Sequence, residues 1–421
     1  MTAIKSCWAL LIGIALIMLG NGLQGTLLGL RATMEGFSTG TIGAVMTGYF
    51  AGFLVGSFLV PKFLKNVGHI RVFAALASLA SVSVLIHPLY PEPVPWFVLR
   101  LITGFAYAGL YVVAESWLND IATNETRGQL LGIYMVIMLG GMGAGQFMLN
   151  LSSPGGAELF ILVSVLVSFS VVPISLSVTR GPRFDTPEHI SMVALYRASP
   201  LGLVGTLVTG MSYGAMFSMS AVFGAESGFS VAWVSYFVAS ILFGGVLMQW
   251  PVGRISDHMD RRRVIITVAL VAATASVSGF FIVERSPVGF LFLMALFGGT
   301  SLPLYSLFIA HTNDFLRPEQ MVAASATLVL VGGIGAMMGP TLCAIAMSLA
   351  GPGGFLWYLA AVHTLVAGFA VYRMTQRPPL PLDEQGHYAS VAPRATGLAA
   401  GIASRTVREQ RDKDMARLMR Y

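Results

Sequence analysis

The sequence predicts an all-α membrane protein with twelve transmembrane helices in two six-helix bundles. Three observations predict this: few charges, recurring apolar segments and an internal duplication. Of the 421 residues, 55% are hydrophobic and only 10% are charged, and the mean hydropathy is +0.75. A soluble domain carries about 25% charged residues. Most of the surface is therefore expected to face lipid.

The apolar segments have the length of membrane spans, since roughly 20 apolar residues in a helix cross a bilayer. We expect spans at about 8–30, 41–64, 70–90, 94–118, 128–150, 158–178, 200–223, 232–253, 264–283, 288–312, 320–349 and 355–374. The first segment follows Lys5 and is too long for the core of a signal peptide, so we expect it to be retained.

Polar segments divide the chain. We expect an N-terminal bundle at 1–178, a cytoplasmic central loop at 179–199, a C-terminal bundle at 200–374 and a polar tail at 375–421. In the tail, 378–400 has no sustained apolar period and is expected to be disordered. Its last part, SRTVREQRDKDMARLMRY, is compatible with a charged helix.

The basic residues predict the orientation. With the N-terminus inside, 22 of the 25 Lys and Arg residues lie on the cytoplasmic side, counting Arg373 at the end of the last span; without Arg373 and the tail the asymmetry is still 13 to 2. Short loops rich in Lys and Arg stay in the cytoplasm. We therefore expect an inner-membrane protein with both termini cytoplasmic, and we attribute the net charge of +6 to topology and not to a nucleic-acid partner.

The two halves resemble each other. RLITGFAYAGLYVVAESWLND aligns with MALFGGTSLPLYSLFIAHTND at an offset of 194, which places Tyr111 on Tyr305 and Asp120 on Asp314. The loop PKFLKNVGHIRV aligns with GRISDHMDRRRV at an offset of 192. Two matches at nearly the same offset indicate a duplication.

The second of these loops carries a recognisable pattern. It consists of Gly253, Arg254, Asp257, Asp260, Arg261, Arg262 and Arg263. This pattern resembles the loop signature of the major facilitator superfamily, whose charges are implied to pair with neighbouring helix ends and to latch the outward-facing state. The first half departs from it, because Pro61 replaces the glycine and Lys65 the aspartate, while Gly68 and Arg71 fit.

Further motifs narrow the resemblance. Arg100 and Gly104 resemble a second signature of the superfamily, in the fourth helix. GGMGAGQF lacks the proline of the antiporter motif, which disfavours drug/proton antiport. VGHIRVF and AESWLND are similar to the YcaD-type branch and to the RfnT-type riboflavin transporters, which implies riboflavin uptake. The resemblance also implies that each half is an inverted pair of three-helix repeats.

One stripe of polar side chains lies in the fourth span. Arg100, Tyr107, Tyr111 and Glu115 fall within an arc of about 80° on one helix face. Charged and polar groups are costly in a membrane. We expect the stripe to bind an anionic or polar aromatic solute and to conduct protons; alternatively, Arg100 snorkels or bonds carbonyl groups of a neighbouring helix. Glu115 is expected in an inner gate with Arg127 or the basic loops, with solute or proton binding as the alternative.

Other spans supply further candidates. Asn21 and Gln24 in NGLQGT lie near the midplane, where transporters bind solutes; alternatively they bridge helices. The second half offers Tyr213, Tyr236, Gln249, Trp250, Tyr305 and His311. As gating or latch residues we expect Glu115, Asp120, Arg127, Gly253, Arg254, Asp257, Arg261, Arg262 and Arg263.

Two glycine pairs predict close helix packing. Gly141 and Gly145 form a GxxxG pattern, as do Gly335 and Gly339. Small residues at this spacing let helix backbones approach each other.

No catalytic or nucleotide-binding motif is present. The sequence has no GxxxxGK[ST], GxSxG or HExxH pattern, and the two cysteines, Cys7 and Cys343, lie in apolar runs without metal-ligand spacing. We expect a monomeric secondary transporter without cofactor or metal, with a small solute as its partner and protons as the candidate coupling ion. The alternatives are an exporter of amphipathic compounds, a membrane-embedded transferase that uses Glu115, His311 and Asp314, and a non-transporting receptor.

Overall fold

The computed structural model describes residues 2–123, 126–176, 190–391, 396–397, 399–401 and 403. Its elements are helices. Within the described residues, twelve helical segments are long and apolar enough to cross a membrane. The predicted fold class is confirmed.

The helices fall into two halves. The first half contains α1 (Thr2–Met34), α2 (Thr39–Val67), α3 (His69–Ile86), α4 (Pro93–Ile121), α5 (Arg127–Phe147), α6 (Glu158–Phe169) and α7 (Val171–Ser175). The second contains α8 (Met192–Ala198), α9 (Pro200–Glu226), α10 (Val231–His258), α11 (Arg261–Ile282), α12 (Pro287–Ser301), α13 (Pro303–Asn313), α14 (Met321–Ala350) and α15 (Gly354–Gln376). Short 3₁₀ turns lie at His87–Leu89, Met148–Leu151, Pro318–Gln320 and Leu382–Glu384.

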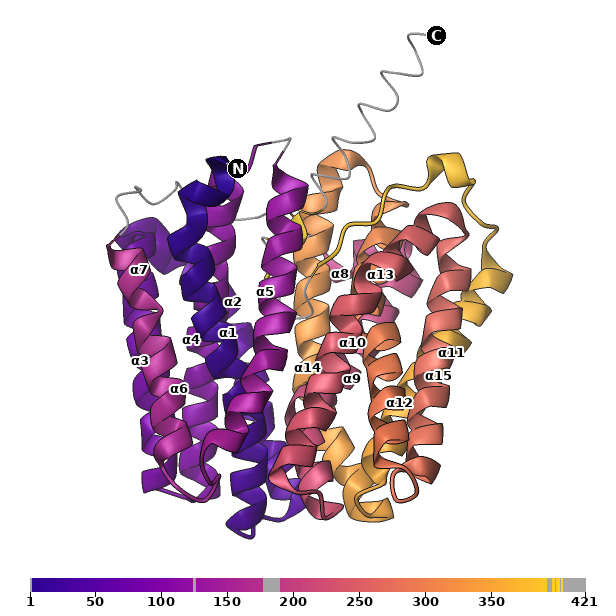
Figure 1. Cartoon of the computed structure of the whole chain (residues 1–421). Helices are drawn as coiled ribbons and strands as arrows, with labels where there is room; N and C mark the ends of the chain where they lie inside the picture. Colours follow the sequence, from indigo (N-terminus) through magenta and orange to yellow (C-terminus); the bar gives the residue numbers. More distant parts are fainter. Residues whose placement is uncertain are drawn as a thin grey trace.

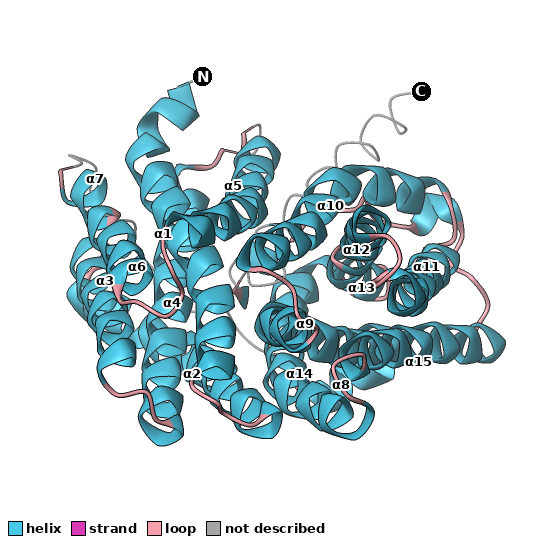
Figure 2. Cartoon of the chain, turned by 60° about the horizontal axis from the view of Figure 1, so that its bottom comes forward, coloured by secondary structure: helices cyan, strands magenta, loops and turns pink. Residues whose placement is uncertain are grey.

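The halves stand side by side as two bundles (Figures 1 and 2). The beginning of α1 and the end of α15 lie toward one end of the bundles, which we call the terminal face; the other end is the far face (Figure 1). Corresponding helices pack in the same pairs, since α2 contacts α4 as α10 contacts α12, and α1 contacts α5 as α9 contacts α14. This equivalence agrees with the duplication inferred from the sequence.

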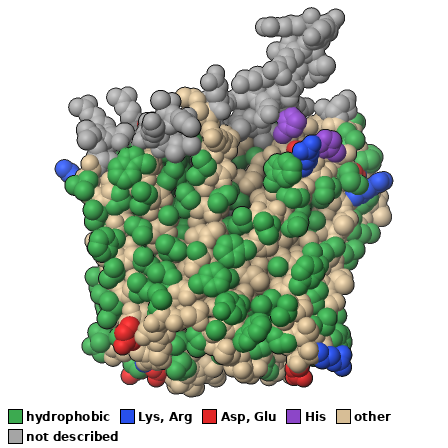
Figure 3. All heavy atoms as spheres, viewed as in Figure 1, with side chains coloured by type: hydrophobic (Ala, Val, Ile, Leu, Met, Phe, Trp, Pro, Cys, Tyr) green, Lys and Arg blue, Asp and Glu red, His purple; other side chains and the backbone are tan. Residues whose placement is uncertain are grey.

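Local sequence explains where the helices begin. Ser38, Ser199, Ser230 and Ser286 each accept a hydrogen bond from a backbone N–H in the first turn of the helix that follows. Such N-caps satisfy donors that have no partner inside the helix. Large apolar side chains cover the visible outer surface, and charged side chains are confined to its two ends (Figure 3).

Glycines bring helix backbones into contact. A Cβ added at Gly145 in α5 would overlap the carbonyl of Leu19 in α1, and one at Gly335 in α14 would overlap the carbonyl of Leu207 in α9. Gly141 and Gly339 also face the partner helix closely. The packing role predicted for both GxxxG pairs is confirmed.

The two halves touch each other toward the far face. The Thr39 hydroxyl donates to Glu226 at 2.6 Å, and the Thr47 and Thr341 hydroxyls lie 2.9 Å apart. Asn150 Nδ2 donates to Ser235 Oγ at 2.9 Å. These contacts join α2 to α9 and α14, and the end of α5 to α10, so the cleft between the halves is closed at the far face.

The prediction that 378–400 is disordered is wrong for its described part. Residues 377–391 turn back from α15 across the terminal face, and Thr396, Gly397, Ala399 and Ala400 lie against the helices (Figure 1). The segment has no apolar period, and backbone groups of Gly386, Tyr388 and Val391 make hydrogen bonds that hold it. The expected charged helix at 404–421 lies outside the described residues, as does 177–189 of the central loop.

Candidate functional site

A narrow aromatic cavity lies where the two halves meet. It has a volume of about 40 Å³ and is lined by Tyr49, Phe50 and Phe53 of α2, Tyr213 and Phe217 of α9, and Tyr305 of α13. Sites for small organic ligands typically measure about 300–1,000 Å³. The cavity is smaller than such sites, so a solute of that size would fit only if the cavity widened.

The predicted stripe on α4 forms one wall beside this cavity. The Arg100 guanidinium carbon lies 4.5 Å from the centre of the Tyr49 ring. The Tyr49 and Tyr107 rings are 6.2 Å apart, and the Tyr107 and Tyr111 rings are 6.1 Å apart. Asn21 of α1 donates a 2.6 Å hydrogen bond to the Tyr111 hydroxyl. Four predicted site residues thus form one chain of contacts, to which the structure adds Tyr49.

The wall from the second half is built around a helix break. Pro303 lacks a backbone N–H and separates α12 from α13, and the Tyr213 hydroxyl donates to the Leu302 carbonyl at 2.7 Å. In a membrane such carbonyl groups need an internal donor. The Tyr213 and Tyr305 rings lie 6.2 Å apart. Both predicted tyrosines line the cavity, and the hydroxyl of Tyr213 also holds the break.

Gln24 is a buried amide at the contact between the halves. Its side chain is 1% exposed, and its amide atoms have no hydrogen-bond partner within the described residues. Leaving a buried polar group unsatisfied costs about 1–3 kcal/mol. The neighbouring Gln146 is engaged, since it donates to the Gly22 carbonyl at 2.8 Å and accepts from Thr26 at 2.5 Å. Gln24 is thus the unsatisfied member of this pair of amides, and its role in solute contact stays a prediction.

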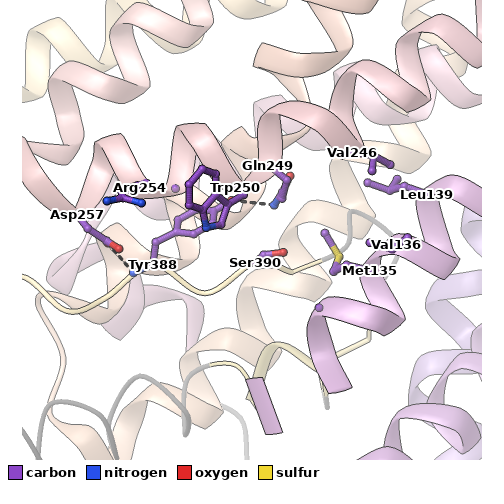
Figure 4. A pocket seen from close by; sticks show the side chains of 12 residues that line it. Met135, Val136, Leu139, Val246, Gln249, Trp250, Arg254, Asp257, Tyr388 and Ser390 are labelled. Carbon is purple, nitrogen blue, oxygen red and sulfur yellow. Dashed lines mark hydrogen bonds between the residues drawn. The ribbon is translucent and has the colours of Figure 1, made fainter. Parts of the chain in front are cut away.

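A larger cavity, which we call the vestibule, opens toward the terminal face. It measures about 560 Å³ and lies between α5 and α10, with Tyr388 and Ser390 of the tail on its third side (Figure 4). Gln249 and Trp250 both line it; Gln249 is 7% exposed, whereas Trp250 is 68% exposed and lies 5.3 Å from the Arg254 guanidinium carbon. Of these two predicted candidates, only Gln249 is buried.

The charged loop of the second half makes the contacts that the resemblance implies. Arg261 pairs with Asp314 at the end of α13 and lies 3.6 Å from Asp257. Arg262 pairs with Asp260 at 3.0 Å. Burial alone would raise the pKa of Asp260, but the hydrogen bonds and charge of Arg262 outweigh it and hold that pKa below its usual value. Arg263 is exposed. Whether this loop latches one transport state stays a prediction.

Glu115 is fully enclosed near the terminal face. Its carboxylate accepts hydrogen bonds from the Tyr134 hydroxyl at 2.9 Å, from the Thr396 hydroxyl and backbone N–H, and from the Ala399 N–H at 3.2 Å. The side chain of Arg127, its predicted gating partner, lies outside the described residues.

The remaining candidates lie apart from the aromatic cavity. His311 is buried with its ring 5.0 Å from that of Phe315, and Tyr236 is exposed beside Phe147. Asp120 is exposed at the end of α4. Glu115 and Asp314, two members of the transferase hypothesis, are engaged by separate partners. Within the described part of the chain, no three His, Cys, Asp or Glu side chains are grouped as metal ligands.

Sequence reasoning missed Tyr49 and Phe53, and it missed the tail. Tyr49 and Phe53 are one helical turn apart in MTGYFAGF and face α4, where the Phe53 ring is 5.9 Å from that of Tyr111. Gly52 and Gly56 bring α2 against α4. Because Tyr49 and Phe53 precede these glycines by three residues, the spacing could have predicted that both rings face α4.

Comparison with known proteins defines the class. The sequence profile described as Major Facilitator Superfamily matches residues 10–340 and 202–407. The chain belongs to this superfamily of membrane transporters.

The chain is also similar to individual proteins, at low sequence identity. The chain is 26% identical to the uncharacterised MFS-type transporter YcaD of Escherichia coli strain SE11, over 80% of this chain and 88% of that protein. A mutant of the nucleoside transporter NupG superposes with a TM-score of 0.73 at 12% identity, covering 86% of this chain and 98% of NupG. A bacterial homologue of the human lysosomal transporter Spinster, in an inward-facing and unoccupied conformation, gives 0.68 at 14% identity, covering 97% and 98%. These two structures show the shared fold.

Proposed function

We propose that this protein is a secondary transporter that takes up a planar aromatic solute, with riboflavin or a similar vitamin as the leading candidate. The observation that carries the proposal is the aromatic cavity between the halves, where rings from α2, α9 and α13 line one space and Tyr107 of α4 packs beside Tyr49. Aromatic rings stack favourably on a planar ligand. Arg100, Asn21 and Gln24 supply polar groups beside them.

The proposed transport cycle rests on which end of the cleft between the halves is closed. The terminal face carries the basic loops that favour a cytoplasmic location, and the far-face contacts close the cleft on the opposite side. Rocking of the halves would exchange which side is closed, with protons as the proposed coupling ion.

An uptake panel tests this proposal. A riboflavin-auxotrophic bacterial host without its own riboflavin uptake would express the protein and receive radiolabelled riboflavin, uridine, thiamine or biotin, with and without an uncoupler. We expect riboflavin to accumulate, and accumulation to fall when the uncoupler removes the proton gradient. Lower accumulation than in the empty host, restored by the uncoupler, would instead indicate an exporter. No difference for riboflavin would remove it as the solute.

A further inference from the structure

The tail crosses from one half of the molecule to the other. After α15 ends at Gln376, residues 377–391 run over the terminal face past α10 and α13, and Thr396 reaches α4 of the first half (Figure 1). The segment therefore lies at the end of the bundles where the vestibule separates α5 from α10.

The charged loop of the second half holds the start of this crossing. The Gly386 N–H donates to Asp314 at 2.9 Å, and its carbonyl accepts from Arg261 at 2.7 Å. The Tyr388 N–H donates to Asp257 at 2.7 Å. Residues predicted to latch the transporter thus bind the backbone of the tail.

The middle of the crossing forms one side of the vestibule. The Tyr388 ring lies directly over Gly253, where a Cβ would overlap it, and Gln249 donates to its hydroxyl at 2.7 Å (Figure 4). Burial raises the pKa of the Tyr388 phenol, which keeps it protonated. Ser306 and the Val391 backbone exchange two hydrogen bonds, of 2.9 and 3.1 Å.

The far end of the crossing is fixed to the first half and to α14. Glu115 accepts hydrogen bonds from Thr396 and Ala399, as described above. Gly397 and Gly401 lie against Ala326 and Val322 of α14. A carboxylate in a membrane helix is costly unless its oxygens accept hydrogen bonds. Here Thr396 and Ala399 of the tail supply several of the donors to Glu115.

We propose that the described tail residues from Gly386 to Ala403 form a detachable plug that blocks the terminal side of the cleft. Because the plug lies between Glu115 of one half and Ser306 of the other, the halves cannot meet at the terminal face while it is bound. The plug is held by separate non-covalent contacts, so it can leave, and its covalent tether returns it at high effective concentration. This inference rests on the proposed alternation of the two halves and adds its regulation.

Cysteine reactivity tests the plug without any solute. Ala326→Cys places a thiol under Gly397, at a position that is 2% exposed. The purified full chain in detergent would react with a water-soluble maleimide, and labelling would be followed by peptide mass spectrometry. The combined variant Tyr388→Ala and Thr396→Pro removes the ring over Gly253 and the two donors that Thr396 supplies to Glu115. Leu382→Pro is the matched control, because Leu382 is 53% exposed in the first position of a 3₁₀ turn, where proline is tolerated.

We expect labelling of the Ala326→Cys thiol to be at least tenfold faster in the combined variant than in the Leu382→Pro control. Native Cys343 is fully buried and reports unfolding, so it should stay unlabelled in both. A second reporter, Ser235→Cys at the far-face contact, should also become reactive when the plug is loosened, because the halves can then move.

Two outcomes would count against the plug. Equal labelling rates of the Ala326→Cys thiol in variant and control would overturn the plug itself. Faster labelling there, with an unreactive thiol in Ser235→Cys, would overturn its role in blocking the motion. Riboflavin uptake does not enter this assay, so failure of the proposed solute would leave its outcome unchanged.

Discussion

At the scale of single residues, Arg100 is the side chain of the site that is most costly to place in a membrane. An arginine within a membrane helix is costly, up to about 2.5–3.5 kcal/mol at the helix centre by insertion scales, and Arg100 lies about two turns from the start of α4. Arg100 is only 4% exposed, and its guanidinium stacks on Tyr49, a contact worth about 0.5–2 kcal/mol. The stacking fixes the cation beside the aromatic cavity. A polar aromatic or anionic solute would meet both the charge and the rings there.

Replacing Arg100 tests this arrangement. Arg100→Ala should abolish uptake of riboflavin while the protein remains in the membrane at its normal level, since the cation is lost and the fold is not. Arg100→Lys should keep partial uptake, because lysine retains the charge but not the planar stacking surface. Uptake counts and membrane immunoblots measure both effects. Undiminished uptake by Arg100→Ala would remove this residue from the mechanism.

At the scale of elements, glycines determine how closely helices cross. Gly104 and Gly298 are related by the internal repeat, and a Cβ at either would overlap a backbone carbonyl, of Tyr49 in α2 or of Ile241 in α10. The same position thus serves the same contact in both halves. Such contacts leave no space for even one methyl group, because protein interiors are closely packed.

Helix α5 offers a matched pair of substitutions. Gly145→Ala should lower thermal stability in detergent, because the added methyl overlaps the Leu19 carbonyl and overpacking costs about 1–3 kcal/mol. Gly140→Ala in the same helix should leave stability unchanged or raise it slightly, because no atom lies within 4 Å of its Cβ position. Equal melting temperatures for the two variants would contradict the packing account.

At the scale of the whole molecule, the sequence predicts the architecture well and the interior contacts only partly. Hydropathy and the repeat suffice for the twelve spans, because lipid selects long apolar segments. Arg100 and Tyr111 are found because polar side chains stand out in such segments. Tyr49 and Phe53 are not, since an aromatic residue in a span is equally compatible with packing. The position of the tail could not be predicted, because its backbone groups bond to side chains that are distant in the sequence. Thr396, for example, donates to Glu115, which is 281 residues away.

The central claim is that solute crosses by rocking of the two halves, and a reversible cross-link at the far face tests it most directly. The hydroxyls of Thr47 in α2 and Thr341 in α14 are 2.9 Å apart. The double variant Thr47→Cys and Thr341→Cys, made with Cys7 and Cys343 replaced by alanine, should form a disulfide under mild oxidation. We predict that riboflavin uptake then stops and that a reducing agent restores it, while Thr47→Cys alone is insensitive to both reagents. Undiminished uptake by fully cross-linked protein would contradict alternating access between the two halves.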